Sequence, residues 1–182
     1  MVTTIQSSFL WLDSKKNMAR NIWVISDTHF GHENIIKYCD RPFKSVYQMN
    51  QTMIENWCRV VNPEDIVYHL GDVYMGADGK DVHEILRRLP GRKRLILGNH
   101  DDGKSAVIQN NFQKVVVWRM FREFGLLLSH VPVHEGTLNP EKCPRNVHGH
   151  IHNNVINDKR YVNVSVEQTN YTPVNIEDLR VW

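Results

Sequence analysis

Four short apolar segments of this chain each stop at a polar side chain, and this repeated ending is the feature that most constrains the fold. The segments are rich in Ile, Val and Leu, and Gly or Ser follows each of them. Such runs are typical of buried β-strands. We therefore expect four strands that each carry a polar group just beyond the last apolar residue. The strands and their polar groups are Ile22–Ile25 with Asp27, Ile66–Leu70 with Asp72, Leu95–Leu97 with Asn99, and Leu126–Leu128 with His130.

Helical patterns lie between these expected strands. The segments Glu33–Tyr38 and Val46–Val61 precede the second strand, and Asp81–Leu89 precedes the third. In Val46–Val61, apolar residues recur every three or four positions, as they do on one face of a helix. Alternating strands and helices indicate a largely parallel sheet covered by helices on both faces. Ligands of such sheets bind beyond the carboxyl ends of the strands.

The last third of the chain changes character, because strand-like runs follow one another there with only short breaks. We expect these runs to form a second, more antiparallel sheet that packs on the first and completes a layered α/β sandwich. The runs are Val115–Trp118, Arg145–His148, Arg160–Val164 and Val174–Ile176.

The length of 182 residues is that of one ordinary domain. We expect a single domain over residues 1–182, in which residues 1–20 form an N-terminal extension. This extension has no apolar stretch followed by a small-residue cleavage site, and no apolar run in the chain is long enough to cross a bilayer. The three cysteines have no metal-binding spacing and fit a reducing compartment. The expectation is a cytoplasmic protein without a membrane segment.

Five clusters of polar residues supply the chemistry that this fold would carry. Their Asp, His and Asn side chains suit manganese, iron, zinc, nickel or magnesium, and the lack of paired cysteines argues against a structural zinc site. They are numerous enough to hold two divalent ions side by side, an arrangement that supports hydrolysis of phosphate esters. The clusters are Asp27–His29, Gly71–Asp72, Gly98–Asp101, Ser129–His130 and Gly149–His152.

The order of these clusters resembles the pattern of the calcineurin-like metallophosphoesterase superfamily. That pattern is Asp-x-His, Gly-Asp, Gly-Asn-His-Asp/Glu, His and Gly-His-x-His, and it is matched here from residue 27 to residue 152. The segment Asp27–Ile36 further resembles small bacterial and phage members. The resemblance implies a four-layer α/β/β/α sandwich, with two mixed sheets flanked by helices, and attack on phosphorus by a hydroxide that bridges two metal ions.

The resemblance also implies which residue binds which ion. Asp72 would bridge the two ions, with manganese expected before iron, zinc, nickel or magnesium. The first ion would take Asp27, His29, Asp72 and His152, and the second would take Asp72, Asn99, His130 and His150.

His100 follows the ligand Asn99 but is not a ligand in the family, so the resemblance implies that it faces the substrate. There it would bind a phosphate oxygen or protonate the leaving alcohol. Asp101 is expected to orient His100, with an equally weighted alternative that Asp101 caps the helix expected from Lys104 to Asn110. Asp102 is more simply explained as such a cap.

Three further residues are expected to bind substrate. His32 follows the first cluster closely enough to reach the same pocket, with a role beside the ligands as the alternative. Arg41 and Arg145 are expected to supply a cation, because the Gly71-Asp72 cluster lacks the Asp-Arg that clamps phosphate in the Ser/Thr protein phosphatases. We therefore expect a small phosphorylated substrate, such as a nucleotide, rather than a phosphoprotein.

Three interpretations of function follow. The leading one is a dinuclear-metal phosphoesterase that acts on monoesters or diesters. The second is a nuclease for DNA or RNA ends, in which the basic cluster Arg87–Arg94 would bind the backbone, although a solvated surface explains that cluster more simply. The third is a non-catalytic scaffold, which would have no need for seven metal-binding side chains. Two other histidines have simpler interpretations, with His69 in the core of a strand and His148 beside the metal ligands.

Overall fold

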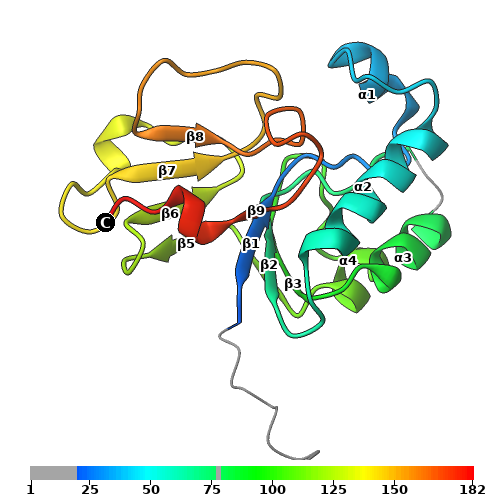
Figure 1. The fold of residues 1–182 in the computed structure, drawn as a ribbon, viewed down its shortest axis with the longest axis horizontal. Helices are drawn as coiled ribbons and strands as arrows, with labels where there is room; N and C mark the ends of the chain where they lie inside the picture. Colours follow the sequence, from blue (N-terminus) through cyan, green and yellow to red (C-terminus); the bar gives the residue numbers. More distant parts are fainter. Residues whose placement is uncertain (1–19, 77–78) are drawn as a thin grey trace, which may run out of the picture.

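Residues 20–76 and 79–182 are described in the computed structural model, and they form two β-sheets stacked face to face (Figure 1). The first sheet has the strand order β4-β3-β2-β1-β9, and the second has the order β5-β6-β7-β8. The strands of the first sheet are β1 (Ile22–Ile25), β2 (Ile66–His69), β3 (Arg92–Ile96), β4 (Lys114–Val116) and β9 (Val174–Asn175). Those of the second are β5 (Trp118–Phe121), β6 (Leu126–Ser129), β7 (Arg145–His148) and β8 (Tyr161–Asn163).

Strands β1 to β4 run parallel, so their carboxyl ends meet at one edge of the first sheet. The expected strands at Ile22–Ile25, Ile66–Leu70 and Leu95–Leu97 are confirmed as β1, β2 and the end of β3. The helices between these strands lie on the outer side of the first sheet (Figure 1). They are α1 (Glu33–Tyr38), α2 (Val46–Val60), α3 (Gly79–Arg88) and α4 (Ala106–Asn111).

Two apolar layers hold these elements together. The first lies between the helices and the first sheet, where α2 buries Met49, Met53 and Trp57 on the face that its sequence period predicts. The second lies between the two sheets, where side chains such as Leu70 and Leu128 are fully buried. Each layer removes apolar surface from water, the main source of folding free energy.

The last third of the chain is distributed differently from the prediction. The expected strand Val115–Trp118 is split at Val117, because β4 joins the first sheet and β5 joins the second. The segment Val174–Ile176 also joins the first sheet, where β9 pairs antiparallel to β1. In the second sheet only β5 is antiparallel to its neighbour, whereas β6, β7 and β8 run parallel. The second sheet is therefore mixed rather than mainly antiparallel.

Two mixed sheets with α-helices confirm the predicted fold class. The layer outside the second sheet differs from the helical layer outside the first sheet. Among the described residues it contains the short 3₁₀ helix η1 (Glu135–Thr137) and no α-helix (Figure 1). Prolines 132, 140 and 144 punctuate the chain between β6 and β7, and proline is poorly accommodated inside a helix.

Other features of the chain bear on the remaining expectations. The predicted extension, residues 1–20, lies outside the described residues except for Arg20. Of the helices that the structure describes, none has both the length and the apolar character needed to cross a membrane. Cys39, Cys58 and Cys143 are all free thiols, as their spacing predicts.

Candidate metal centre

The seven predicted ligands converge at the carboxyl ends of β1, β2, β3 and β6 and in the loop after β7. Five of them have a positive φ, a backbone conformation that is uncommon outside glycine and that clusters at functional sites. The loops thus turn sharply as they leave the strands and direct these side chains to one place. The five residues and their φ angles are Asp27 (58°), His29 (48°), Asp72 (55°), His150 (69°) and His152 (49°).

The ligand atoms form two groups, each within 4.8 Å. One group is Asp27, His29 and His152, and the other is Asp72, His130 and His150. Asn99 belongs with the second group, because its Oδ1 lies 2.9 Å from His130 Nε2. These groups have the membership that the family resemblance implies for the two ions.

Asp72 lies between the two groups. Its Oδ2 is 3.7 Å from His29 Nε2 in the first group and 3.4 Å from His130 Nε2 in the second. Burial by itself would raise the pKa of Asp72, but the hydrogen bond and charge of His130 outweigh burial and hold that pKa at about 2. Asp72 is therefore an ionised carboxylate with one oxygen close to a histidine of each group.

The donor set fits divalent cations. Asp27 Oδ1 and both ring nitrogens of His29 are buried and have no hydrogen-bond partner in the described part of the chain. Buried polar atoms without partners are costly and rare, so such a cluster calls for a ligand. Carboxylate oxygens and imidazole nitrogens are both common ligands of divalent transition metals.

The outer nitrogens of two ligand histidines are held by fixed acceptors. His130 donates from Nδ1 to the carbonyl oxygen of Leu70 at 2.7 Å, and His152 donates from Nδ1 to Glu167 Oε1 at 3.0 Å. These bonds leave Nε2 of each ring directed toward the other ligands. Support of this kind selects the tautomer and strengthens a histidine as a metal ligand.

Two of the five clusters need glycine because other backbone and side-chain atoms approach it closely. A Cβ on Gly98 would overlap the carboxylate of Asp72, and a Cβ on Gly149 would overlap Ser26 Oγ and the carboxylate of Asp27. Only glycine lets these loops approach the ligands so closely.

Arg41 is not in the position that its predicted role requires. Its side chain is buried, with Nη2 donating to the Asp27 carbonyl at 2.7 Å and Nη1 donating to the Thr28 carbonyl at 3.1 Å. Its Nε donates to Glu167 Oε1 at 2.9 Å. The prediction that Arg41 binds substrate is therefore wrong. Arg41 instead ties the Asp27 loop to the carboxylate that holds His152.

Glu167 is the functional residue that the sequence did not reveal. It accepts hydrogen bonds from Arg41 and His152, which lie 126 and 15 residues away in the chain. No spacing or motif in the sequence links these three residues, so only the folded chain brings them together.

Replacing Glu167 with glutamine is expected to weaken binding of one metal equivalent by about 10- to 100-fold, the usual cost of losing such a support. The affected ion is the one held by Asp27, His29 and His152. Competition with a chromophoric chelator measures this affinity without reference to activity. Glu64→Gln is the matched control, because Glu64 pairs with Arg92 at the opposite end of the sheet. Equal affinities in both variants would contradict the assigned role.

Arg145 also lies elsewhere. It begins β7, whereas the ligand loop follows the other end of that strand, and its Nη1 donates to the carbonyl oxygen of Leu179 at 2.8 Å. The prediction that Arg145 binds substrate is wrong for this reason.

Asp101 has a different function from either predicted one. Its carboxylate accepts hydrogen bonds from the backbone N–H groups of Asp72, Val73 and Gly98 at 2.9 to 3.0 Å. Ser105, rather than Asp101, caps α4. Asp101 therefore does not orient His100 through a side-chain bond but ties the loop of Asp72 to the loop of Asn99.

An open cleft of about 710 Å³ lies beside the ligands. His100 is exposed on its wall, with its ring centroid 5.8 Å from that of His29. His32 lines the same cleft, with its ring centroid 5.4 Å from that of His29. Tyr38 and Met75 add apolar surface. Both histidines are thus within reach of a substrate, and their roles there stay predictions.

The remaining candidates lie away from the cleft. His69 is fully buried with Nε2 2.9 Å from Thr28 Oγ1, which confirms it as a core histidine. His148 is also buried, and its Nδ1 bonds to the carbonyl oxygen of Gly149 rather than to a ligand side chain. The cluster Arg87–Arg94 precedes or begins β3, at the opposite end of this strand from Asn99.

Comparison with known proteins agrees with this geometry. The model of the calcineurin-like phosphoesterase family matches residues 20–175. An uncharacterised protein of Methanocaldococcus jannaschii is 44% identical over 168 residues, which cover 87% of this chain and 88% of that protein. The gene 66 protein of Mycobacterium phage L5 is 37% identical over 83 residues, 44% of this chain and 40% of the phage protein.

A solved structure is also similar. The crystal structure of a protein of unknown function from Aquifex aeolicus has a TM-score of 0.73 and 30% identity, and the match covers 88% of this chain and 97% of that one. Fold, ligand order and sequence likeness therefore agree, and the chain belongs to the calcineurin-like phosphoesterase family.

Proposed function

We propose that this protein is a phosphoesterase that uses two divalent metal ions to hydrolyse phosphomonoesters or phosphodiesters. Family membership supports metal-dependent phosphoester hydrolysis as the general chemistry. The observation that carries the two-ion proposal is the position of Asp72 Oδ2, 3.7 Å from one ligand group and 3.4 Å from the other. Among the ions, manganese is our first candidate, and the cytoplasm is our candidate compartment.

The two ions, when bound, would polarise the phosphoryl oxygens and lower the pKa of the water that attacks phosphorus. The protein's own residues prepare this step. Asp72 supplies negative charge between the two ligand groups, and Asp101 holds the backbone of its loop in place. His100 stands exposed beside the ligands and would protonate the leaving oxygen.

The lining of the cleft indicates the kind of substrate. In the described residues that line it, histidines and uncharged side chains occur but no Lys or Arg. Neutralisation of the phosphate would therefore rest on the ions and the histidines. The exposed Tyr38 and the neighbouring Met75 offer apolar contacts to an organic group. We propose a small organic phosphate, such as a nucleotide, as the substrate.

The scaffold alternative is disfavoured because the ligand set is complete and its members converge. The nuclease alternative cannot use the cluster Arg87–Arg94 as first proposed. Arg87 and Arg92 pair with Glu84 and Glu64, and Lys93 is buried against the carbonyl oxygen of Leu89. Two of the cations are therefore paired with acidic groups and a third is buried, and the cluster stands before or at the start of β3, away from Asn99.

The test is hydrolysis of 4-nitrophenyl phosphate and bis(4-nitrophenyl) phosphate, followed by a panel of nucleotides. We expect turnover that disappears after dialysis against a chelator and returns with Mn²⁺, with two metal equivalents bound per chain at full activity. A protein that holds two equivalents of metal and cleaves none of these esters would refute the proposal. Activity that reaches its maximum at one equivalent would refute the two-ion form of it.

A further inference from the structure

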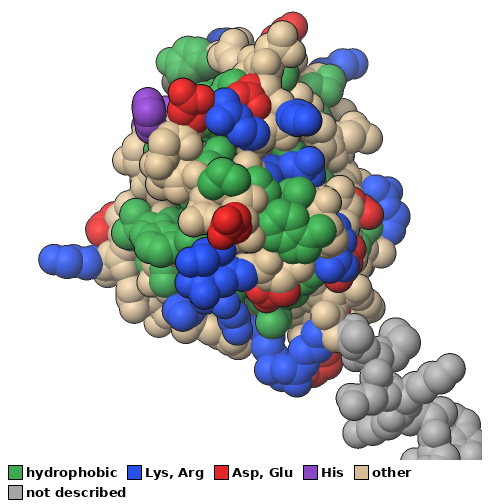
Figure 2. Space-filling model, turned by 90° about the vertical axis from the view of Figure 1, so that its left-hand side faces the viewer, with side chains coloured by type: hydrophobic (Ala, Val, Ile, Leu, Met, Phe, Trp, Pro, Cys, Tyr) green, Lys and Arg blue, Asp and Glu red, His purple; other side chains and the backbone are tan. Residues whose placement is uncertain are grey.

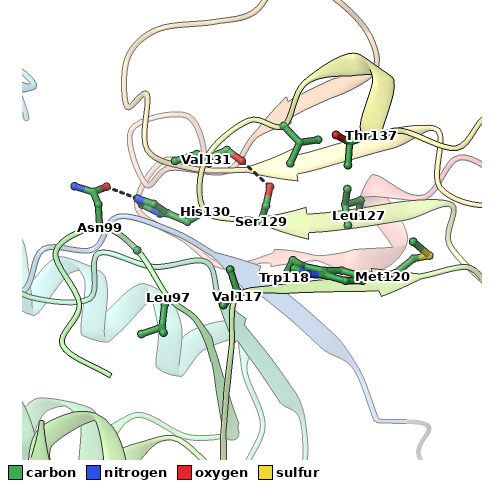
Figure 3. Close-up of a pocket in the computed structure, with 12 residues that line it drawn as sticks. Leu97, Asn99, Val117, Trp118, Met120, Leu127, Ser129, His130, Val131 and Thr137 are labelled. Carbon is green, nitrogen blue, oxygen red and sulfur yellow. Dashed lines mark hydrogen bonds between the residues drawn. The ribbon is translucent and has the colours of Figure 1, made fainter. Parts of the chain in front are cut away.

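A second hollow, outside the cleft, lies against the outer face of the second sheet (Figure 3). This groove has a volume of about 440 Å³ and is mostly apolar. Strands β5 and β6 line one side of it with Trp118, Met120 and Leu127. Val131 and Val133, from the segment after β6, line another side. Because η1 takes the place of an α-helix in this layer, the groove stays open to solvent.

Three large apolar side chains at the groove are exposed to solvent. Val117 is 69% exposed, Trp118 is 57% exposed and Val131 is 45% exposed. Figure 2, which looks at the molecule from the side of the second sheet, shows hydrophobic side chains interspersed with Lys and Arg side chains on the surface. Adjacent exposed apolar residues commonly mark a binding surface.

The groove is continuous with the metal centre. Asn99 and His130, both predicted ligands, stand at its end, and a dashed line joins them in Figure 3. Trp118 pairs with Ser129, the residue just before His130, and neighbouring strands lie about 4.8 Å apart. His100, which follows Asn99 directly, faces the cleft instead. The predicted ligands therefore lie between two hollows.

Basic side chains border the groove on the side away from the metals. Trp118 and Met120 also line a neighbouring hollow with Lys114, Arg119 and Arg122. None of these three cations takes part in a salt bridge within residues 20–76 and 79–182. They differ in this respect from Arg87 and Arg92, whose charges are paired.

We propose that this groove binds a short single-stranded oligonucleotide whose terminal or internal phosphodiester is held at the metal centre. The proposal rests on the proposed function and extends its substrate from a single nucleotide to a short chain of nucleotides. A base would stack on Trp118 inside the apolar groove, and phosphates of the same oligonucleotide would pass around β5, an edge strand, to Arg119 and Arg122 in the neighbouring hollow. Arg119 lies over the Phe121 ring at 4.9 Å, but no acidic group in the described part of the chain neutralises its charge. An aromatic platform beside positive charge is the usual means of binding single strands. Strand β5 leads away from His130 over roughly 10 Å, so the oligonucleotide would run along β5 from the metal centre toward Arg122.

The test measures binding of a fluorescein-labelled four-nucleotide thymidine oligomer with phosphorothioate linkages to the full-length, manganese-loaded protein. Fluorescence anisotropy should show binding that weakens as salt rises, with a log–log slope of about −2 for three phosphate contacts. Trp118→Ala should weaken binding about tenfold, the effect of losing one stacked base. Arg119→Glu combined with Arg122→Glu should weaken it further and flatten the salt dependence.

Arg87→Glu combined with Arg88→Glu is the matched control, since it changes the same charge at the far end of the sheet and should leave binding unaltered. Equal weakening by the control pair, or no weakening by either groove variant, would overturn the proposal. So would a dimer in sedimentation equilibrium that Trp118→Ala dissociates, because a second copy would then occupy the groove. Hydrolysis of 4-nitrophenyl phosphate without oligonucleotide binding would refute only the proposal that the groove binds an oligonucleotide. Oligonucleotide binding without hydrolysis of any ester would refute the proposed phosphoesterase function.

Discussion

Replacing Asp72 with asparagine is expected to remove metal and activity together. Asp72 Oδ2 lies near a histidine of each ligand group, at 3.7 Å from His29 Nε2 and 3.4 Å from His130 Nε2. An amide keeps the shape but loses the negative charge between the cations. Since bound metal ions contribute several kcal/mol to catalysis, we expect kcat/KM to fall by at least about a thousandfold.

Mass-spectrometric metal analysis of the purified variant gives the first readout, and turnover of 4-nitrophenyl phosphate gives the second. Asp81→Asn is the matched control, because Asp81 is exposed on α3 and should change neither quantity. A variant Asp72→Asn that retained two tightly bound equivalents would show that Asp72 does not bridge the ions.

Replacing His100 with alanine should have the opposite combination of effects. His100 is exposed on the wall of the cleft, and its backbone N–H donates to Asp72 Oδ1 at 3.0 Å, a bond that alanine preserves. We therefore expect both metal equivalents to stay bound. Loss of a general acid should reduce kcat by about 10²- to 10⁴-fold.

The leaving group gives this prediction its sharpest form. Nitrophenolate leaves readily without a proton, whereas an alkoxide does not, so the loss should be much larger for an alkyl phosphate than for 4-nitrophenyl phosphate. Steady-state kinetics with both esters measures the difference. His83→Ala, on α3 outside the cleft, should leave both rates unchanged. An equal loss for the two esters would assign His100 to phosphate binding rather than to proton transfer.

Four of the predicted ligands depend on a local signal in the sequence. An apolar run predicts a strand, and the polar residue after it must lie at the strand's carboxyl end, as Asp27, Asp72 and Asn99 do. Parallel strands of the first sheet bring these three ends to one edge, whereas His130, His150 and His152 come from the second sheet. The family resemblance added which ligands belong together, and the two groups have that membership.

Roles that depend on contacts with residues far away in the chain were not predictable from the sequence. Arg41 and Arg145 were expected to supply a cation to the substrate because the Gly71-Asp72 cluster lacks the Asp-Arg of the Ser/Thr protein phosphatases. The fold buries Arg41 against Glu167 and leaves Arg145 at the other end of β7. Asp101 was expected to contact His100 next to it, but its carboxylate is used by three backbone N–H groups.

The sequence by itself predicted the alternation of strands and helices from β1 to β3, and its motifs, through the family resemblance, predicted the residues that gather at the candidate metal centre. The tertiary structure alone decided which sheet each late strand joins, which charges are paired and where an open groove meets the metal centre. Periodicity and strand ends are properties of neighbouring residues, whereas burial and charge pairing depend on contacts between residues such as Arg41 and Glu167, 126 positions apart. The same reason moved the candidate nucleic-acid surface from Arg87–Arg94 to Trp118, Arg119 and Arg122.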